Sequence, residues 1–400
     1  MRAYSESNEE ALRARNLLKD WAGEGFLTEA QYQRMEQETA CELRRTNIFL
    51  RFVLFLFTLI IVGAAVALFF VVFRPESQTT GVFLLIFAAV SYAAAELAVS
   101  RARLYRYGIE EALAACSVGF LCVGMQVAFF SGLFSSPPPG GTGYLVPAAG
   151  TIVSLWIWHR FGLPYASLAA MIFVVRLPGY WTSSHSAQHL IIASFYAVGL
   201  LTVAAVRPRH RFTYLNNEYS IAEALLWLGI YLAINLQLSS VNLLGQWWGG
   251  LRTTTEFSRP FYWATWVLIW CLPPVVLARG LRQKDRFVIA VGAIVAILTL
   301  VTNKPYLGWQ RHTWDPMLMG ALLIGVALFI RRWLADGPGE IRRGFTAHRL
   351  SGKDKRWMNA GATAFGLVSP NIITPSPQTG SPEVHFGGGD SGGGGASSDF

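Results

Sequence analysis

The chain is poor in charged residues and in cysteine, and both shortages restrict what it can be. Charged residues make up 14% of its 400 residues, whereas an ordinary soluble domain has roughly 25%. The four cysteines show no CxxC spacing, which argues against a disulfide framework or a zinc site. HExxH and a P-loop lysine are also lacking, and no GxSxG nucleophile elbow lies along the apolar runs, so the sequence points to no catalytic residue, metal ion or cofactor.

The chain contains instead a series of apolar runs. Hydrophobic residues make up 53% of the sequence, and the runs predict an all-α, polytopic membrane helix bundle with about ten transmembrane helices. A hydrocarbon core about 30 Å thick needs about 20 helical residues. The fourth, fifth and ninth runs are short by that measure, so ten is a best count. The runs cover residues 52–73, 81–99, 112–134, 144–158, 164–176, 187–206, 221–239, 260–278, 287–302 and 316–334.

Positive charge is distributed unevenly over the ends of these runs. The net charge is +9, with sixteen Lys and Arg at one set of run ends and six at the other. Positively charged loops are retained in the cytoplasm, so we expect a multi-pass protein of the cytoplasmic membrane with both termini in the cytoplasm. Arginines at the ends of apolar runs serve orientation, and nucleic acid is not an expected partner.

Polar segments flank the membrane domain on both sides. The N-terminal segment predicts a cytoplasmic helical hairpin, in which Thr28 and Gln31 have capping-box spacing at the start of the second helix. So short a segment cannot build a strong core, and we expect residues 1–45 to pack on the membrane domain or on a cytoplasmic protein partner. The Pro/Ser/Gly-rich tail cannot bury enough surface to fold and is expected to be disordered. The predicted domains are the hairpin (1–47), the transmembrane domain (48–334), a basic cytoplasmic segment (335–368) and the tail (369–400).

Two polar residues inside the apolar runs have a structural explanation that we prefer to a functional one. Gln126 lies near the middle of the third run and is expected to hydrogen-bond to another helix rather than line a cavity. Glu96 lies near the cytoplasmic end of the second run, where it can reach the headgroup layer or pair with Arg101 or Arg103.

Other polar residues sit where helices are expected to begin or bend. Glu223 follows Ser220 by three residues, which predicts a capping box. Asp315 precedes a proline and is expected to cap the last run, and the serines Ser183, Ser184 and Ser186 are expected to cap the sixth. The pair at 273–274, both proline, should bend the eighth run.

The outward loops gather aromatic and basic residues and are the preferred candidates for a binding site. Trp and Tyr at this depth also form the ordinary interfacial belt of membrane proteins. The alternative is an outward cup in which aromatic faces stack on a sugar or lipid headgroup while arginines hold an anionic part. His185 and His189 have the i, i+4 spacing of zinc ligands, but no third ligand lies beside them. The candidate ligand-binding residues are Trp181, His185, His189, Trp247, Trp248, Arg252, Trp309, Arg311, His312 and Trp314.

The N-terminal stretch LLKDWAGEGFLTEAQ, from Leu17 to Gln31, resembles the cytoplasmic helical hairpin that opens a family of uncharacterised bacterial integral membrane proteins with a domain of unknown function. The resemblance implies a protein of the bacterial cytoplasmic (inner) membrane. It carries no active-site residues to this chain.

The sequence therefore leaves several functions open. The first is a non-enzymatic protein that binds or moves a lipid-linked or small hydrophilic molecule through the outward aromatic loops. The second is a membrane-embedded enzyme acting on a lipid or glycan at the outer face, with His185, His189, His312 or Asp315 as acid or base. The third is a membrane scaffold or sensor. The shortage of paired carboxylates favours the non-enzymatic functions, and membrane lipids are the expected partners.

Overall fold

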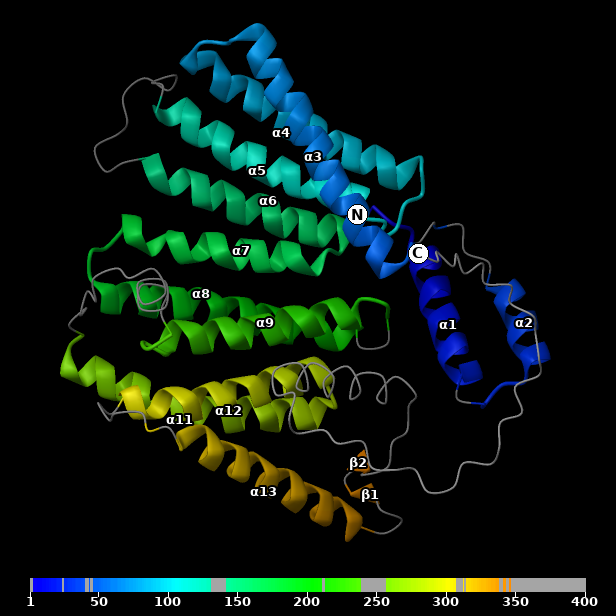
Figure 1. The fold of residues 1–400 in the computed structure, drawn as a ribbon, viewed down its shortest axis with the longest axis vertical. Helices are drawn as coiled ribbons and strands as arrows, with labels where there is room; N and C mark the ends of the chain where they lie inside the picture. The colour runs from blue at the N-terminus through cyan, green and yellow to red at the C-terminus, as the bar shows by residue number, and fades with distance from the viewer. Residues whose placement is uncertain are drawn as a thin grey trace, which may run out of the picture. The chain divides into compact units, whose positions relative to one another are not determined.

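The computed structural model of this protein is built of α-helices (Figure 1). It describes residues 3–23, 25–39, 43, 46–130, 142–210, 213–238, 257–306, 312, 314–337, 341–342 and 345–346. Short 3₁₀ turns lie at Thr142–Tyr144, Pro178–Tyr180 and Arg207–His210. The α-helices are α1 (Glu6–Gly23), α2 (Glu29–Glu38), α3 (Ile48–Phe73), α4 (Ser77–Ser100), α5 (Ile109–Phe130), α6 (Leu145–Phe161), α7 (Pro164–Arg176), α8 (His185–Val206), α9 (Asn216–Ile234), α11 (Arg259–Gln283), α12 (Arg286–Tyr306) and α13 (Asp315–Ala335).

The chain divides into two compact units, residues 1–325 and 326–400. In the second unit, the described residues are the end of α13 and two short antiparallel strands, β1 (Ile341–Arg342) and β2 (Phe345–Thr346). The first unit holds α1 to α12 and the start of α13.

Among the described residues, seven helices are long and apolar enough to cross a membrane: α3, α4, α5, α8, α11, α12 and α13. Each of the ten predicted runs contains an α-helix, but α6, α7 and α9 do not meet this standard. Over the described residues, a helical fold with candidate membrane-spanning helices is therefore confirmed, whereas the count of about ten spans stays a prediction. The ninth run, expected to be short, forms α12 and is among the seven.

Three predicted helix starts can be compared with the structure. Thr28 caps α2 through the expected capping box, in which the Thr28 side chain accepts from the Gln31 amide and the Gln31 side chain accepts from the Thr28 amide. Of the three serines expected to cap α8, Ser184 is the cap, and its side chain accepts from the Ala187 amide. Asp315 is the first residue of α13 rather than its cap, and its carboxylate accepts from the backbone N–H of His312 at 2.9 Å.

Two other local expectations concern α11 and α5. α11 runs through both prolines of the pair to Gln283, and the bend expected there stays a prediction. Gln126 is exposed on α5 rather than buried against a neighbouring helix. That exposure removes the reason for expecting an interhelical hydrogen bond, because such bonds form where helices bury a polar side chain between them.

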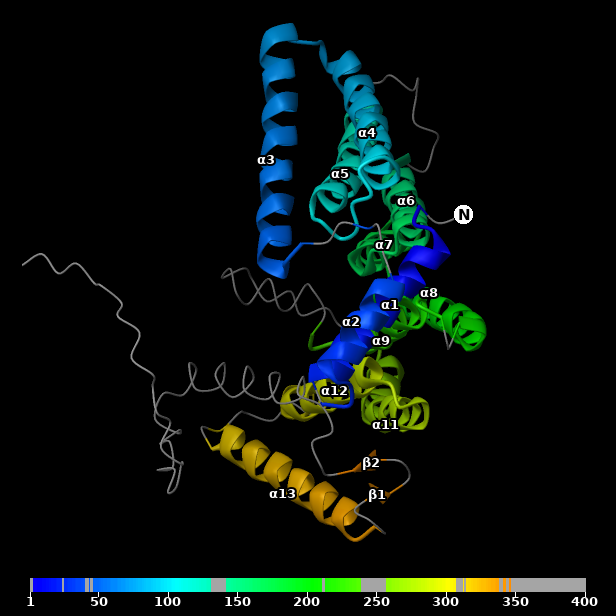
Figure 2. The ribbon, with the colours of Figure 1, turned by 90° about the vertical axis from the view of Figure 1, so that its right-hand side faces the viewer.

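α4 and α5 pack closely along most of their length, whereas α3 makes few contacts. The close packing depends on small residues, since a Cβ at Gly81 would lie 2.8 Å from the backbone nitrogen of Ala128, and small residues let membrane helices approach. α3 stands apart from α4 and α5 in Figure 2, and only 6% of its most apolar stretch is buried. A helix with mean hydropathy 2.9 and so little protein contact is suited to a lipid environment.

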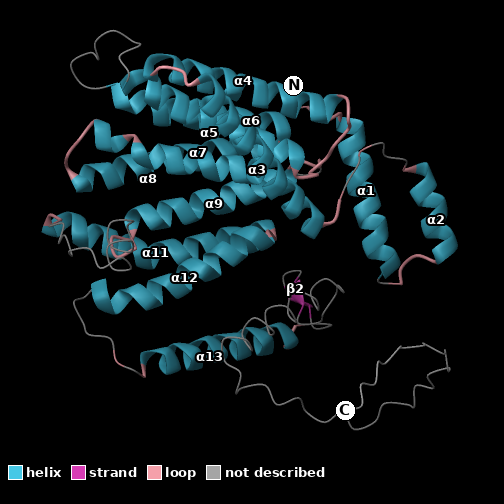
Figure 3. Cartoon of the chain, turned by 45° about the horizontal axis from the view of Figure 1, so that its top comes forward, coloured by secondary structure: helices cyan, strands magenta, loops and turns pink. Residues whose placement is uncertain are grey.

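α9 is the most buried helix of the bundle and contacts α7, α8, α11 and α12 (Figure 3). Its buried residues include Tyr231, which is fully enclosed beside Ile269 and Val295. The Tyr231 hydroxyl accepts from Asn235 at 2.9 Å and from Thr299 at 3.0 Å. These bonds satisfy polar groups that would otherwise be costly inside an apolar bundle.

Candidate functional site

Five of the ten predicted binding residues fall on described parts of the chain. Trp247, Trp248, Arg252, Trp309 and Arg311 lie outside the described residues.

The observed contacts of the described candidates are local ones. Trp181 lies 6.2 Å from Phe195, ring to ring. His189 contacts the carbonyl oxygen of Ala233 through Nδ1 at 2.7 Å, so that ring nitrogen is engaged. His312 stacks on Trp314 at 5.8 Å, and His185 is exposed at the start of α8.

The better-built polar region lies at the opposite end of the bundle, which we call the arginine-rich end. It consists of the first turns of α3, α5, α7, α9 and α12, the last turns of α4, α6, α8 and α11, and the segments between them. Carboxylates bind its arginines across helices: Arg51 pairs with Glu111, Arg106 with Glu218, Arg160 with Glu96, and Arg207 with Glu223 and Asp285.

One of these pairs corrects a prediction. Glu96 does not pair with Arg101 or Arg103, which follow it in the chain. It pairs with Arg160 at the end of α6, whose Nε and one terminal guanidinium nitrogen both donate to the Glu96 carboxylate. Trp156, one turn earlier on α6, donates to the Tyr92 hydroxyl at 2.8 Å. The charged pair thus fastens α6 to α4, two helices whose charged ends are 64 residues apart in the chain.

Arg207, just after α8, is the centre of a buried ionic network. Its guanidinium donates to Glu223 at 2.6 Å and to Gln283 at 2.9 Å, and it also pairs with Asp285. Glu223 is fully buried and accepts from Arg279 as well, at 2.6 Å. The network joins α8, α9, α11 and the turn before α12, and it shows that the predicted capping box is wrong: α9 begins at Asn216, so Glu223 lies inside the helix.

Asp285 holds the turn between α11 and α12. Its carboxylate accepts from the Ser220 hydroxyl at 2.5 Å and from the Phe287 amide at 2.9 Å, which caps α12. Burial alone would raise the pKa of Asp285, but the Ser220 hydrogen bond and the Arg207 charge outweigh burial and hold that pKa below its usual value. The carboxylate is therefore ionised at neutral pH.

The N-terminal segment is inserted into the arginine-rich end. The Ala3 amide donates to the Arg160 carbonyl at 2.9 Å, and the Tyr214 amide donates to the Glu10 carboxylate at 2.9 Å. Tyr4 is only 5% exposed, and its ring meets that of Tyr105 edge-on at 4.8 Å. The hairpin is thus fastened to the membrane bundle, in agreement with one of the two arrangements expected for it.

Raising the pH above about 10 should loosen this attachment, because Tyr4 must stay protonated to remain buried. Burial, followed by the charge of Glu110, raises the pKa of Tyr4 well above its usual value. A raised folded-state pKa gives stability that is complete below the unfolded-state pKa and is lost as the pH rises toward the folded one. We expect trypsin cleavage within α1 to accelerate above about pH 10.

The Tyr4→Phe variant separates this effect from general alkaline unfolding. Phenylalanine keeps the ring but cannot ionise, so its cleavage rate should rise less with pH than that of the wild type. Tyr32→Phe, on α2, should behave as the wild type. Identical pH profiles for all three proteins would contradict the role assigned to Tyr4.

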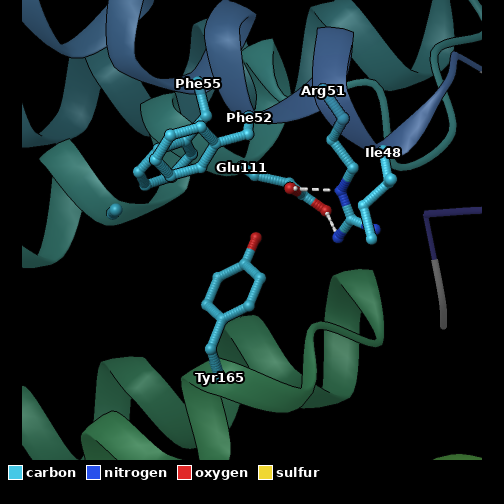
Figure 4. A pocket seen from close by; sticks show the side chains of 7 residues that line it. Ile48, Arg51, Phe52, Phe55, Glu111 and Tyr165 are labelled. Carbon is cyan, nitrogen blue, oxygen red and sulfur yellow. Dashed lines mark hydrogen bonds and ion pairs between the residues drawn. The ribbon is translucent and has the colours of Figure 1, made fainter. Parts of the chain in front are cut away.

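A cavity of about 320 Å³ lies beside this end, between α3, α5 and α7. Figure 4 shows the Arg51 guanidinium paired with Glu111 at one side of the cavity and the Tyr165 hydroxyl pointing toward them. The Nε of Arg51 donates to Glu111 at 2.8 Å, and the Glu111 side chain is only 4% exposed. The rest of the lining is apolar and comes from Ile48, Phe52, Phe55 and Ala115.

Sequence reasoning missed this cavity, although a signal for it was present. The acidic residues Glu96, Glu111, Glu218, Glu223 and Asp285 occur at the same run ends as the arginines. Acid and base gathered at one end of a membrane bundle indicate interhelical pairing. Counting only the positive residues for orientation hid that pattern.

Comparison with models of known protein families, with curated proteins and with solved structures finds no match.

Proposed function

We propose that this protein is a non-enzymatic integral membrane protein that binds an amphiphilic, lipid-class molecule in the cavity between α3, α5 and α7. We place the protein in a bacterial cytoplasmic membrane and the cavity at the cytoplasmic leaflet, because the arginine-rich end carries most of the loop arginines. The hairpin α1–α2 then serves as the cytoplasmic module attached to that end.

The observation that carries this proposal is that the cavity has one apolar side and one polar side. Its volume of about 320 Å³ lies at the lower end of the range for ligand sites, roughly 300–1,000 Å³. Such sites combine an apolar wall with a few placed polar groups. Here Phe52 and Phe55 supply the wall and the Arg51–Glu111 pair with Tyr165 supplies the polar side.

The exposure of α3 supports a ligand that comes from the membrane. Phe52, which lines the cavity, is 60% exposed, so one wall of the cavity borders the surface that lipid would cover. A molecule with an apolar chain could reach the cavity without crossing the packed core of α4 and α5.

The hairpin offers a second route to function, that of a scaffold. Trp21 is 46% exposed and Phe26 is 72% exposed, and exposed aromatic side chains on a soluble module favour a protein partner. This reading agrees with a cytoplasmic partner for residues 1–45. The outward cup, as a binding or an enzymatic site, remains the alternative at the other end of the bundle.

Filling the cavity should abolish lipid binding without unfolding the protein. Ala115 is exposed on α5 and lines the cavity, so Ala115→Leu adds apolar volume where there is space. We expect native mass spectrometry of protein released from nanodiscs to show loss of a retained lipid adduct, by about tenfold or more. Melting of the variant should change little, because the new methyl groups remain in apolar surroundings.

Ala93→Leu is the matched control. Ala93 is exposed on α4 and does not line the cavity. Its leucine variant should retain as much lipid as the wild type. Equal lipid retention by Ala115→Leu and Ala93→Leu would place the lipid elsewhere and overturn the proposed function.

A further inference from the structure

We propose that the molecule bound in this cavity is a phospholipid whose headgroup carries a primary ammonium next to its phosphate. This inference rests on the proposed function and names its ligand class. The ammonium is assigned to Glu111 and the phosphate to Arg51.

The first step is the position of the ion pair. Arg51 lies in the first turn of α3 and Glu111 in the first turn of α5, so the pair joins two helix starts at the arginine-rich end. The Arg51 side chain is 29% exposed and the Glu111 side chain is 4% exposed. Both border the cavity, so a ligand there meets two opposite charges side by side.

The second step is charge balance. A purely anionic headgroup that draws Arg51 away would leave Glu111 buried without a countercharge, and a purely cationic one would do the same to Arg51. Uncompensated buried charge is strongly unfavourable. A zwitterion with adjacent charges replaces one ion pair by two and leaves neither residue unpaired, because guanidinium holds phosphate and carboxylate holds ammonium.

The third step distinguishes between zwitterionic headgroups. A carboxylate accepts hydrogen bonds, and Glu111 therefore favours a primary ammonium, which has three N–H donors, over a quaternary ammonium, which has none. Figure 4 shows the Tyr165 hydroxyl pointing toward Glu111. That hydroxyl offers a further donor or acceptor to the same headgroup.

The fourth step commits the ligand to a lipid rather than a free headgroup. Phe52, Phe55 and Ile48 line the cavity at the beginning of a helix able to span a membrane. A water-soluble headgroup would leave this apolar wall uncovered, whereas the glycerol and first methylenes of an acyl chain would cover it.

The experiment offers three lipids of identical acyl chains in equal amounts within one nanodisc preparation: phosphatidylethanolamine, phosphatidylcholine and phosphatidylglycerol. Native mass spectrometry of the released full-length protein then counts the bound lipids. We expect the ethanolamine lipid to exceed each of the others by about fivefold. The same excess should vanish in the double variant Arg51→Gln, Glu111→Gln, which removes both charges together and leaves no single charge buried.

Each other outcome has a definite meaning. Bound lipid in the wild type without preference for the ethanolamine headgroup overturns this inference while leaving the proposed function standing. An unchanged preference in the double variant also overturns it, provided that the variant melts as a folded protein. If soluble glycerophosphoethanolamine raised the melting temperature of the protein as much as the lipid does, the assignment to a lipid would be refuted. If neither the wild type nor Ala115→Leu retained any lipid, the proposed function itself would be refuted.

Discussion

Arg207→Ala should lower the free energy of unfolding by about 3 kcal/mol, because breaking a buried ion pair leaves its partners without their countercharge. Arg207 binds Glu223, Gln283 and Asp285 at once. The expected loss lies at the low end of the range for buried pairs, since Glu223 keeps Arg279 and Asp285 keeps Ser220. Reversible unfolding in mixed detergent micelles measures the change.

Arg209→Ala is the control for that result. Arg209 belongs to the same 3₁₀ turn and carries the same charge, but it is exposed. Its loss should change the free energy of unfolding by less than about 0.5 kcal/mol. If the two alanine variants were equally stable, the network around Arg207 would not be a structural element of the bundle.

The positions of the helices could be predicted because a membrane limits them strongly. A lipid-crossing helix must be apolar over about 20 residues, and α3 and α4 accordingly cover residues 48–73 and 77–100, close to the runs expected at 52–73 and 81–99. α9 was harder. It has buried Glu218 and Glu223 along its first half, and its buried face depends on neighbours that no local pattern specifies.

The choice of ionic partners could not be predicted from the sequence. Glu96 lies near the end of α4 and has two arginines in the segment that follows, yet it pairs with Arg160, 64 residues away. The nearer partners are obvious in the sequence, whereas the true one depends on which helix packs beside α4. The same limit applies to Glu111 with Arg51, 60 residues apart, and so to the cavity that this pair borders.

In the described part of the predicted outward site, residue spacing does not identify what a side chain contacts. His189 was singled out because its spacing to His185 resembles that of zinc ligands, but its Nδ1 contacts the carbonyl oxygen of Ala233. A backbone acceptor at the end of a neighbouring helix leaves no trace in the local sequence. Spacing alone therefore identifies which side chains share a helix face, and it does not identify what they bind.

Gly108→Ala should be among the most disruptive single changes in the chain, with an expected loss of about 2–5 kcal/mol from backbone strain and overpacking together. Gly108 has φ +104°, a conformation that residues with a Cβ rarely adopt. A Cβ there would also overlap the carbonyl oxygen of Arg51 and lie 3.1 Å from the Phe55 nitrogen. Both contacts are backbone atoms of α3, which cannot move aside as a flexible side chain can.

The expected consequence is displacement of the first turns of α3, and with them the Arg51–Glu111 pair and the cavity wall at Phe55. Unfolding in mixed micelles gives the stability, and lipid retention in native mass spectrometry gives the state of the cavity. Gly119→Ala on α5 is the control, because a Cβ there meets nothing within 4 Å and alanine favours the helix. Wild-type stability and lipid retention in Gly108→Ala would mean that α3 is not held against the start of α5, and the cavity between them would lose its structural basis.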